Sequence, residues 1–301
     1  MKIIITGATG HFGRQVTGEL LKSRAPEELI LITRKPERLA DLAARGASVR
    51  YGNFDEAASL PAAFEGCERM LLISTARVGT RVGQHGNAIK AAAKAGVRQI
   101  AYTSFVGIAP DNPALVVKDH GATEELLRQS GTGWTALRDS QYSEALAGVI
   151  APMVFATGKW TAAADEGKVA FVSRADCVAC AAAVLTTPGH ENKVYNITGP
   201  ELMSFREACA LLSEISGRTL EYVSVSEEVR FAEFDALGVP RDASDDPTHE
   251  VPWCSTDMVS FEQAIRAGYF AVISDDVKRL TGRPPVSLRE VYLAHKPSWP
   301  K

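Results

Sequence analysis

The sequence predicts an α/β protein in which a doubly wound parallel sheet is joined by a smaller region of mixed helices and strands. Three observations support this prediction. Short β-branched runs alternate with segments of helical apolar spacing over the first 138 residues, which is typical of strands connected by helices. A glycine-rich turn follows the first run. After residue 138 the alternation stops, and no internal repeat replaces it.

Six strands are predicted in the first half, over residues 3–6, 29–33, 48–51, 70–74, 99–104 and 134–137. Continuous apolar strands separated by helices long enough to be crossovers are typical of a parallel sheet that is covered on both faces and connected in the right-handed sense. Ligands of such sheets lie outside the carboxyl ends of the strands. We therefore expect the functional residues to follow the strands directly.

The second half has a mixed pattern. Helices are predicted over residues 142–150, 175–187, 205–215 and 288–294, and strands over residues 169–172, 194–198 and 220–225. Gly217 is expected to end the helix at 205–215, and residues 157–167 and 242–247 are expected to be polar connections. We divide the chain into a domain over residues 1–150 and a smaller region over residues 151–301, whose sheet and helices partly interleave with the first domain.

Composition limits the classes of partner. The 33 Lys and Arg against 36 Asp and Glu leave a net charge of −3, which argues against a broad surface for nucleic acid or for an anionic membrane. Five cysteines, an odd number, indicate a reducing cytosol. The sequence shows neither a secretory leader nor a run of about 20 apolar residues. We expect a soluble, cytoplasmic monomer or homodimer.

The glycine-rich turn predicts a phosphate site. Gly7, Gly10 and Gly13 are spaced three apart between a strand and a helix. Such glycines let the backbone turn sharply and approach a pyrophosphate, whose charge the helix N-terminus favours. The alternative is a turn that only packs helix on strand, but the place of the motif after the first strand favours dinucleotide binding. The same loop contributes Thr9, His11 and Phe12 to the predicted cofactor site.

The end of the second strand predicts which dinucleotide is bound. Sites for NAD place an Asp or Glu there to hold the ribose 2′-hydroxyl, whereas this sequence has Arg34 and Lys35. These cations attract a 2′-phosphate through charge-assisted hydrogen bonds, so we predict NADP(H). The alternative is a solvated basic turn.

Hydroxyl side chains follow the next two strands. Ser74 and Thr75 end the fourth strand, and Thr103 and Ser104 end the fifth. We expect these ends to flank the cofactor ribose and the nicotinamide. Ordinary capping of strand ends is the alternative for any single hydroxyl.

Several segments spread over essentially the whole chain share the pattern of one family, namely residues 6–13, 53–54, 71–74, 101–104, 120–124, 137–144, 174–176 and 189–195. The sequence thereby resembles the NmrA-like atypical short-chain dehydrogenases/reductases, and among them the branch of NADPH-dependent quinone oxidoreductases, triphenylmethane reductases and azoreductases. The resemblance implies a Rossmann-type domain and a small C-terminal substrate domain. It also implies that Asn53 and Phe54 border the adenine and that Arg138 and Asp139 line the ribose and nicotinamide.

Two positions depart from that family. Asn53 stands where the family usually has Asp, and Asp139 stands where it usually has Asn. The second change adds a possible negative charge beside the nicotinamide. A carboxylate there could stabilise the oxidised nicotinamide ring or could form an ion pair with Arg138. We expect the ion pair.

The usual proton donor of short-chain dehydrogenases, a Tyr followed four residues later by a Lys, is missing from its expected place. Only Tyr292 and Lys296 have this spacing, and we interpret it as coincidence because they lie in the predicted final helix. The expected place holds His120 and Glu124 instead. Lys118 and His120 could each donate a proton or contact the cofactor. The alternative is a solvated surface residue for Lys118 and a helix-cap or packing residue for His120.

Without the Tyr–Lys proton donor, the protein is expected to reduce acceptors that need little help from an acid. A quinone, a quinone-like azo tautomer or a carbocation accepts hydride readily, and the protein then mainly holds the two reactants together. We predict an NADPH-dependent reductase of a flat, electron-poor aromatic acceptor, without metal or flavin, with Ser104, Tyr142 and His120 as catalytic residues. Tyr142 either contacts the acceptor or is a core aromatic. Two alternatives stay open: a non-catalytic NADP(H)-binding redox sensor, and a carbonyl or imine reductase or isomerase of narrow specificity.

Other side chains are predicted to be structural. Cys177 and Cys180 lie in an Ala-rich helix without a second cysteine pair, so we expect packing rather than metal or redox chemistry. His190 is expected to be a loop residue. Three aromatic side chains of the second half either line an acceptor pocket or pack in the core, and we favour the core. They are Phe155, Trp160 and Phe171.

Overall fold

A computed structural model describes residues 1–243 and 253–300. Its centre is a sheet of seven parallel strands in the order β3-β2-β1-β4-β5-β6-β9. The chain runs outward from β1 to β3 and returns to β4 on the other side of β1, so the topological switch point lies between β1 and β4. This arrangement confirms the predicted doubly wound sheet. The strands are β1 Ile3–Ile5, β2 Leu29–Thr33, β3 Ser48–Tyr51, β4 Arg69–Leu72, β5 Gln99–Phe105, β6 Gly133–Asp139 and β9 Lys193–Ile197.

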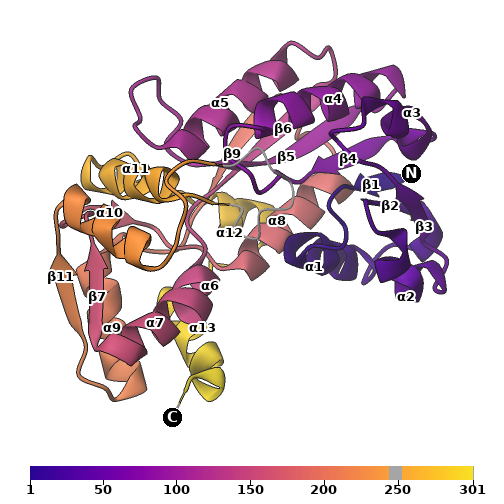
Figure 1. Cartoon of the computed structure of the whole chain (residues 1–301). Coiled ribbons are helices and arrows are strands. Elements are labelled where there is room, and N and C mark those ends of the chain that lie inside the picture. The colour runs from indigo at the N-terminus through magenta and orange to yellow at the C-terminus, as the bar shows by residue number, and fades with distance from the viewer. Residues whose placement is uncertain (244–252, 301) are drawn as a thin grey trace.

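Helices cover both faces of this sheet (Figure 1). Side chains alternate along a strand, so Ile3 and Ile5 pack toward α1 and α8, whereas Ile4 packs toward α3 and α4. The face of Ile3 carries α1 His11–Leu20, α8 Arg174–Thr186 and α12 Asp276–Thr281, and the opposite face carries α3 Leu60–Phe64, α4 Arg81–Lys94 and α5 Leu115–Arg128. Short helices connect the strands, namely η1 Pro26–Glu28, η2 Pro36–Leu39, α2 Ala40–Ala43 and η3 Ala57–Ser59.

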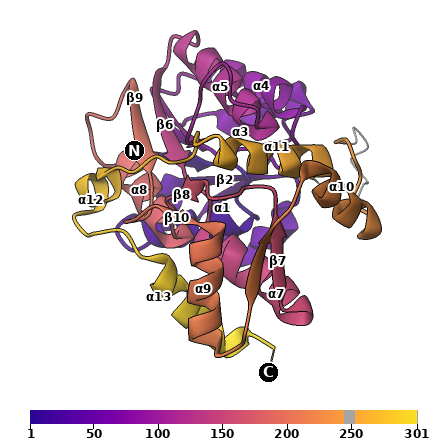
Figure 2. The same cartoon turned by 90° about the vertical axis from the view of Figure 1, so that its left-hand side faces the viewer.

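The remaining elements form a smaller body beyond the carboxyl ends of the strands. Two small sheets contribute to it, a parallel pair of β7 with β11 and an antiparallel pair of β8 with β10. Figure 2 shows α9 and α13 side by side, with β7 and β11 next to them. The elements are α6 Ser143–Ala145, the π-helix η4 Leu146–Ile150, α7 Ala151–Thr157, β7 Lys159–Ala162, β8 Lys168–Val169, β10 Met203–Ser204, α9 Phe205–Ser216, β11 Glu221–Ser224, α10 Glu227–Ala236, α11 Ser255–Arg266, α13 Leu288–His295 and η5 Lys296–Ser298.

Several expectations for the second half need correction. The region 157–167 contains β7, and the strand predicted over 169–172 is the two-residue β8. The strand predicted over 194–198 joins the main sheet beside β6. Gly217 ends α9 at a φ of +74°, as predicted. The connection predicted over 242–247 lies, from residue 244 onward, outside the described residues.

One apolar cluster joins the two halves of the chain. It contains Val106 and Val117 from the first half together with residues of α9 and α13, so the proposed division at residue 150 does not separate two cores. Trp160 and Phe171 are buried in this cluster and both stack on Phe205. The core alternative for these aromatics is confirmed, and the acceptor-wall hypothesis is wrong for both, because both are buried against Phe205 of α9.

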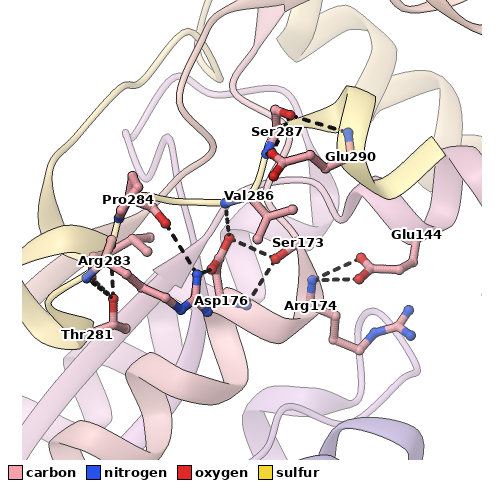
Figure 3. A network of polar contacts seen from close by, with 11 residues as sticks. Glu144, Ser173, Arg174, Asp176, Thr281, Arg283, Pro284, Val286, Ser287 and Glu290 are labelled. Atoms are coloured by element: carbon pink, nitrogen blue, oxygen red, sulfur yellow. Dashed lines mark hydrogen bonds and ion pairs between the residues drawn. The ribbon is translucent and has the colours of Figure 1, made fainter. Parts of the chain in front are cut away.

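A buried carboxylate ties the C-terminal segment to α8 (Figure 3). Asp176 is fully buried and accepts hydrogen bonds from Arg283 Nη1 at 2.6 Å and from the Val286 backbone N–H at 2.8 Å. Ser173, the N-cap of α8, donates its hydroxyl to the same carboxylate at 2.8 Å. Glu144 accepts the backbone N–H of Arg174 at 2.9 Å. These contacts fix the first turn of α8 close to the end of β6.

Replacing Asp176 by Ala should lower the free energy of unfolding by about 2–4 kcal/mol, because buried donors lose their acceptor. Urea unfolding measures this change. The control is Glu214→Ala, which removes a carboxylate paired with Arg289 where both side chains are exposed; the expected loss is below about 1 kcal/mol. Equal losses in the two variants would contradict the structural role of Asp176.

Candidate active site

The turn after β1 is shaped by the close approach of helix α1. Gly7 has a φ of +57°, a conformation that favours glycine. A Cβ atom at Gly13 would lie 2.5 Å from the Gly7 carbonyl oxygen and 2.8 Å from the Ala8 Cα. Since neither contact is possible for a real side chain, position 13 requires glycine. The first turn of α1 therefore rests directly on the loop.

The N-terminus of α1 offers unpaired N–H groups. Gly10 is the N-cap, no side chain caps the helix, and the first turn contains no acidic residue. Arg14 donates its N–H to the Gly10 carbonyl at 2.9 Å, and the N–H groups before it have no intrahelical acceptor. Together with the helix dipole they favour an anion. Thr9 contacts Thr33 at 3.2 Å, Oγ1 to Oγ1, which ties this loop to the end of β2.

The end of β2 carries unpaired positive charge. Arg34 and Lys35 are exposed, and neither side chain forms an ion pair within residues 1–243 and 253–300. By contrast, Arg14 pairs with Asp41 at 3.3 Å. Thr33 Oγ1 accepts the N–H of Lys35 at 3.0 Å and thereby holds this turn. A phosphate beside the β2 end would meet two cations and no competing carboxylate at positions 34 and 35.

Asn53 and Phe54 follow β3. The Asn53 amide donates to Glu56 Oε1 at 2.9 Å, and its Oδ1 accepts the N–H of Asp55 at 3.1 Å. Phe54 is buried, and its carbonyl accepts from Asn87 Nδ2 at 2.9 Å. Asn53 therefore shapes its own loop, and the contact of both residues with an adenine stays a prediction.

Hydroxyls near the end of β5 and after β4 hold the loop that follows β4. Thr103 Oγ1 accepts the N–H of Ser74 at 2.8 Å and donates to Ser74 Oγ at 3.3 Å. The N–H of Thr75 donates to His85 Nε2 at 3.1 Å, so that nitrogen is unprotonated. Burial and then the charge of Arg81 lower the pKa of His85 to about 3. These contacts position the backbone at the predicted ribose and nicotinamide site.

Successive residues of β6 point to opposite faces of the sheet, which separates Arg138 from Asp139. Arg138 donates to fully buried Glu124 in bidentate fashion, at 2.8 Å from Nε and 2.7 Å from Nη2. Ser104 Oγ donates to the same carboxylate at 2.7 Å, and Arg128 pairs with it at 2.9 Å. The expected Arg138–Asp139 pair is therefore wrong, and strand alternation alone could have excluded it.

His120 lies inside the protein. Tyr102 Oη is 2.7 Å from its Nδ1, and Arg81 Nη1 is 3.5 Å from its Nε2. Burial, followed by the charges of Arg81 and His85, lowers the pKa of His120 well below its usual range. A neutral, buried imidazole and a Ser104 bonded to Glu124 favour positioning roles for these two predicted catalytic residues.

Asp139 and Tyr142 form a second polar group on the other face. Tyr142 donates its hydroxyl to Asp139 Oδ2 at 2.8 Å. Burial raises the pKa of Asp139 to about 7, although hydrogen bonds from Tyr142 and Cys177 act in the opposite direction. The Tyr142 ring stacks on Phe12, with centroids 6.5 Å apart and planes inclined by 9°, and the Arg174 guanidinium lies 5.5 Å from its centroid. Tyr142 thus adjoins the glycine loop. Arg174 was not predicted as a site residue, although the N-cap Ser173 marks a helix start at this edge.

Apart from Cys177, whose thiol contacts Asp139, the other predicted residues are not part of these two groups. Tyr292 is fully buried in α13, so its spacing with Lys296 is a coincidence, as interpreted. Cys177 and Cys180 are buried and free, which confirms their packing role. Lys118 is exposed on α5, and His190 contacts Thr187 and Tyr195 near the start of β9.

The described residues contain neither a metal-ligand cluster nor a membrane-spanning helix. No group of three or more His, Cys, Asp or Glu side chains in that part of the chain could hold a metal ion. Among the same residues, no helix is both long enough and apolar enough to cross a bilayer.

Comparisons of sequence place these features among known proteins. A profile of the NAD(P)H-binding family matches residues 7–188. Quinone oxidoreductase 2 of Escherichia coli is 38% identical over 243 residues, which cover 81% of this chain and 84% of the relative. NAD(P)H azoreductase of Xenophilus azovorans is 29% identical over 97% of both chains.

Solved structures agree with these matches. An NADPH-dependent quinone oxidoreductase from Escherichia coli, complexed with NADPH, superposes with a TM-score of 0.88 at 34% identity and covers 97% of this chain and 99% of that chain. The Citrobacter triphenylmethane reductase complexed with NADP(H) gives a TM-score of 0.86 at 32% identity over 98% and 100% of the two chains. The whole described architecture therefore has solved counterparts.

Replacing Gly13 by Ala should lower the free energy of unfolding by about 1–3 kcal/mol, because α1 must move away from the loop. The control is Gly18→Ala in the same helix, where an added Cβ would meet no atom within 4 Å; there we expect a gain of about 0.5–1 kcal/mol. Urea unfolding distinguishes the two, and a stabilised Gly13→Ala variant would show that the close approach is not a constraint.

Asp139 should make the protein more stable at pH 5 than at pH 8. Its folded pKa of about 7 exceeds the unfolded value, so its contribution is complete below the unfolded pKa and is lost as pH rises through 7. The expected loss between pH 5 and pH 8 is about 2–3 kcal/mol.

Asp139→Asn should remove this part of the pH dependence of urea unfolding. Burial also raises the pKa of Asp119, Asp257 and Glu262, but these acids are common to both proteins. The difference between wild type and variant therefore isolates Asp139. Identical slopes with pH would mean that Asp139 is not buried as a neutral acid.

Proposed function

The chain belongs to the NAD(P)H-binding family, and from this we propose that it is an NADPH-dependent reductase that passes hydride directly to a flat, electron-poor aromatic acceptor. The relatives are named as quinone oxidoreductase, azoreductase and triphenylmethane reductase, in agreement with the resemblance inferred from the sequence motifs. We take quinones, azo dyes and triarylmethane dyes as the acceptor class of this chain.

The observation that supports NADPH most strongly is the combination of the α1 N-terminus with the cations at the β2 end. Gly13 lets α1 rest directly on the turn after β1, and the N–H groups of the uncapped first turn would bind a pyrophosphate there. Arg34 and Lys35 are exposed and unpaired among the described residues, and would bind a 2′-phosphate. The residues present therefore fit the dinucleotide.

The bound dinucleotide supplies the hydride and its two electrons. The chain holds the two reactants side by side, which is the main source of rate for an acceptor that becomes aromatic or neutral on reduction. Ser74 and Thr75 fix the loop after β4, while Asp139 and Tyr142 border the same edge after β6. Glu124 of α5 neutralises Arg138 of β6 and accepts a hydrogen bond from Ser104 of β5. These contacts hold the three elements together beneath this edge.

A steady-state assay of NADPH oxidation with a quinone, an azo dye and a triarylmethane dye tests the proposal. We expect turnover with at least one of these classes and little with aliphatic ketones. Binding of NADPH and NADP⁺ without any turnover would instead favour the redox sensor, and efficient reduction of a ketone or imine would favour the narrow reductase. Failure to bind either cofactor would refute all three.

Replacing Arg34 by Ala should weaken NADPH binding by about 1.5–3 kcal/mol, the contribution of a charged hydrogen bond. NADH affinity should hardly change, because NADH has no 2′-phosphate. Isothermal titration calorimetry with both cofactors measures the effect. Arg45→Ala, a neighbouring exposed arginine beyond α2, is the control and should leave both affinities unchanged. Equal losses for NADPH and NADH in Arg34→Ala would show that Arg34 does not contact the 2′-phosphate.

A further inference from the structure

The carboxyl group of Asp139 is buried without a counter-ion. It is 3% exposed and forms no ion pair within the described ranges 1–243 and 253–300. The groups that face it are the Tyr142 hydroxyl, from the segment after β6, and the Cys177 thiol of α8, with Cys180 of the same helix nearby. Arg174 faces the Tyr142 ring rather than the carboxyl. A buried anion in such surroundings is unfavourable unless a cation approaches it.

The place of this carboxyl relative to the dinucleotide follows from the topology. The cations at the β2 end lie on one side of the switch point, and β4, β5 and β6 lie on the other. A dinucleotide whose pyrophosphate contacts the α1 N-terminus and whose 2′-phosphate contacts Arg34 must extend its nicotinamide toward β4 to β6. Phe12, from the first turn of α1, stacks on Tyr142. The Asp139–Tyr142 pair therefore borders the nicotinamide half of the site.

We infer that Asp139 is the proton store and counter-ion of the reaction, neutral beside NADPH and ionised beside NADP⁺, and that Tyr142 carries its proton to the acceptor. This inference rests on the proposed function. It has an electrostatic basis, because a neutral acid beside the neutral reduced ring and a carboxylate beside the cationic oxidised ring both leave the buried site without net charge. An Asn side chain at this position could not do this, because its amide does not ionise.

The proton step balances with hydride transfer to a quinone. The acceptor gains a hydride and becomes an oxyanion. Tyr142 then gives its Oη proton to that oxygen while Asp139 gives the proton on Oδ2 to Tyr142 Oη. The products are a hydroquinone and an Asp139 carboxylate that accepts the Tyr142 hydroxyl, which is the hydrogen bond seen in the structure. Asp139 takes up one proton from solution before the next turnover, so each turnover consumes one proton.

Cofactor binding tests the counter-ion role without turnover. In a weakly buffered solution with a pH indicator at pH 7, wild-type protein should release more protons on binding NADP⁺ than on binding NADPH. The 2′-phosphate is common to both cofactors, so the difference isolates the redox-dependent group. The ratio of NADP⁺ affinity to NADPH affinity should rise about tenfold between pH 6 and pH 8, which corresponds to one unit of pKa.

Asp139→Asn should abolish both the proton difference and the pH dependence of the affinity ratio. The matched control is Asp275→Asn, the same isosteric change at an exposed carboxylate that makes no cap hydrogen bond to α12, and it should behave as wild type. A pH-independent affinity ratio in wild type, or an unchanged response in Asp139→Asn, would overturn the inference. Absence of NADP(H) binding by wild type would instead overturn the proposed function and the inference together.

The choice of acceptor tests the role of Tyr142. A quinone needs a proton in addition to hydride, whereas a triarylmethane cation becomes neutral with hydride alone. Tyr142→Phe keeps the ring that stacks on Phe12 but lacks the hydroxyl proton, so quinone turnover should fall about 100-fold relative to dye turnover, as for loss of a general acid. Wild-type quinone turnover should also fall as pH rises above 7. Equal effects of Tyr142→Phe on the two acceptors would refute proton transfer through Tyr142.

Discussion

The close approach of α1 to the turn after β1 is the constraint on which the site depends. Because position 13 has no room for a side chain, the first turn of α1 rests on the loop and presents its N–H groups at the edge of the sheet. The same contact places Phe12 against Tyr142, so the helix that is expected to bind the pyrophosphate also meets the segment after β6. A single backbone approach thereby sets the separation between the phosphate end and the reactive end of the site.

Because side chains alternate along β6, the charged residues Arg138 and Asp139 point to opposite faces of the sheet. Arg138 turns toward α5, where it pairs with Glu124, and the same carboxylate also pairs with Arg128 and accepts a hydrogen bond from Ser104. Asp139 turns toward α8 and meets only neutral groups, Tyr142 and Cys177. Glu124 thus neutralises positive charge on one face, whereas the ionisation of Asp139 on the other face depends on what binds beside it.

Local patterns were sufficient for the first half of the fold. The strands predicted at 29–33 and 48–51 have those bounds in β2 and β3, and the glycine turn joins strand to helix as expected, because propensity and hydrophobic period act over a few neighbouring residues. The second half was predicted less well. β7 and β8 are short and pair with β11 and β10, which are distant in sequence, and such pairs leave little period for a sequence to show. The predicted cofactor residues lie near or just beyond the strand ends, with Thr103, Arg138 and Asp139 still inside β5 and β6, whereas Ser104 and His120 are enclosed.

What the sequence by itself determined is the sheet, the glycine turn after β1, the cations after β2 and the absence of a Tyr–Lys pair after β5, since each is a property of residue types at fixed short spacing. Only the tertiary structure decided which charges meet. Glu124 reaches Arg138 from another element, Asp139 loses its expected partner, and Arg174 comes to lie over Tyr142. The reason is that the electrostatic state of a side chain depends on the groups that surround it in space and on its distance from water, and neither quantity is encoded by spacing along the chain.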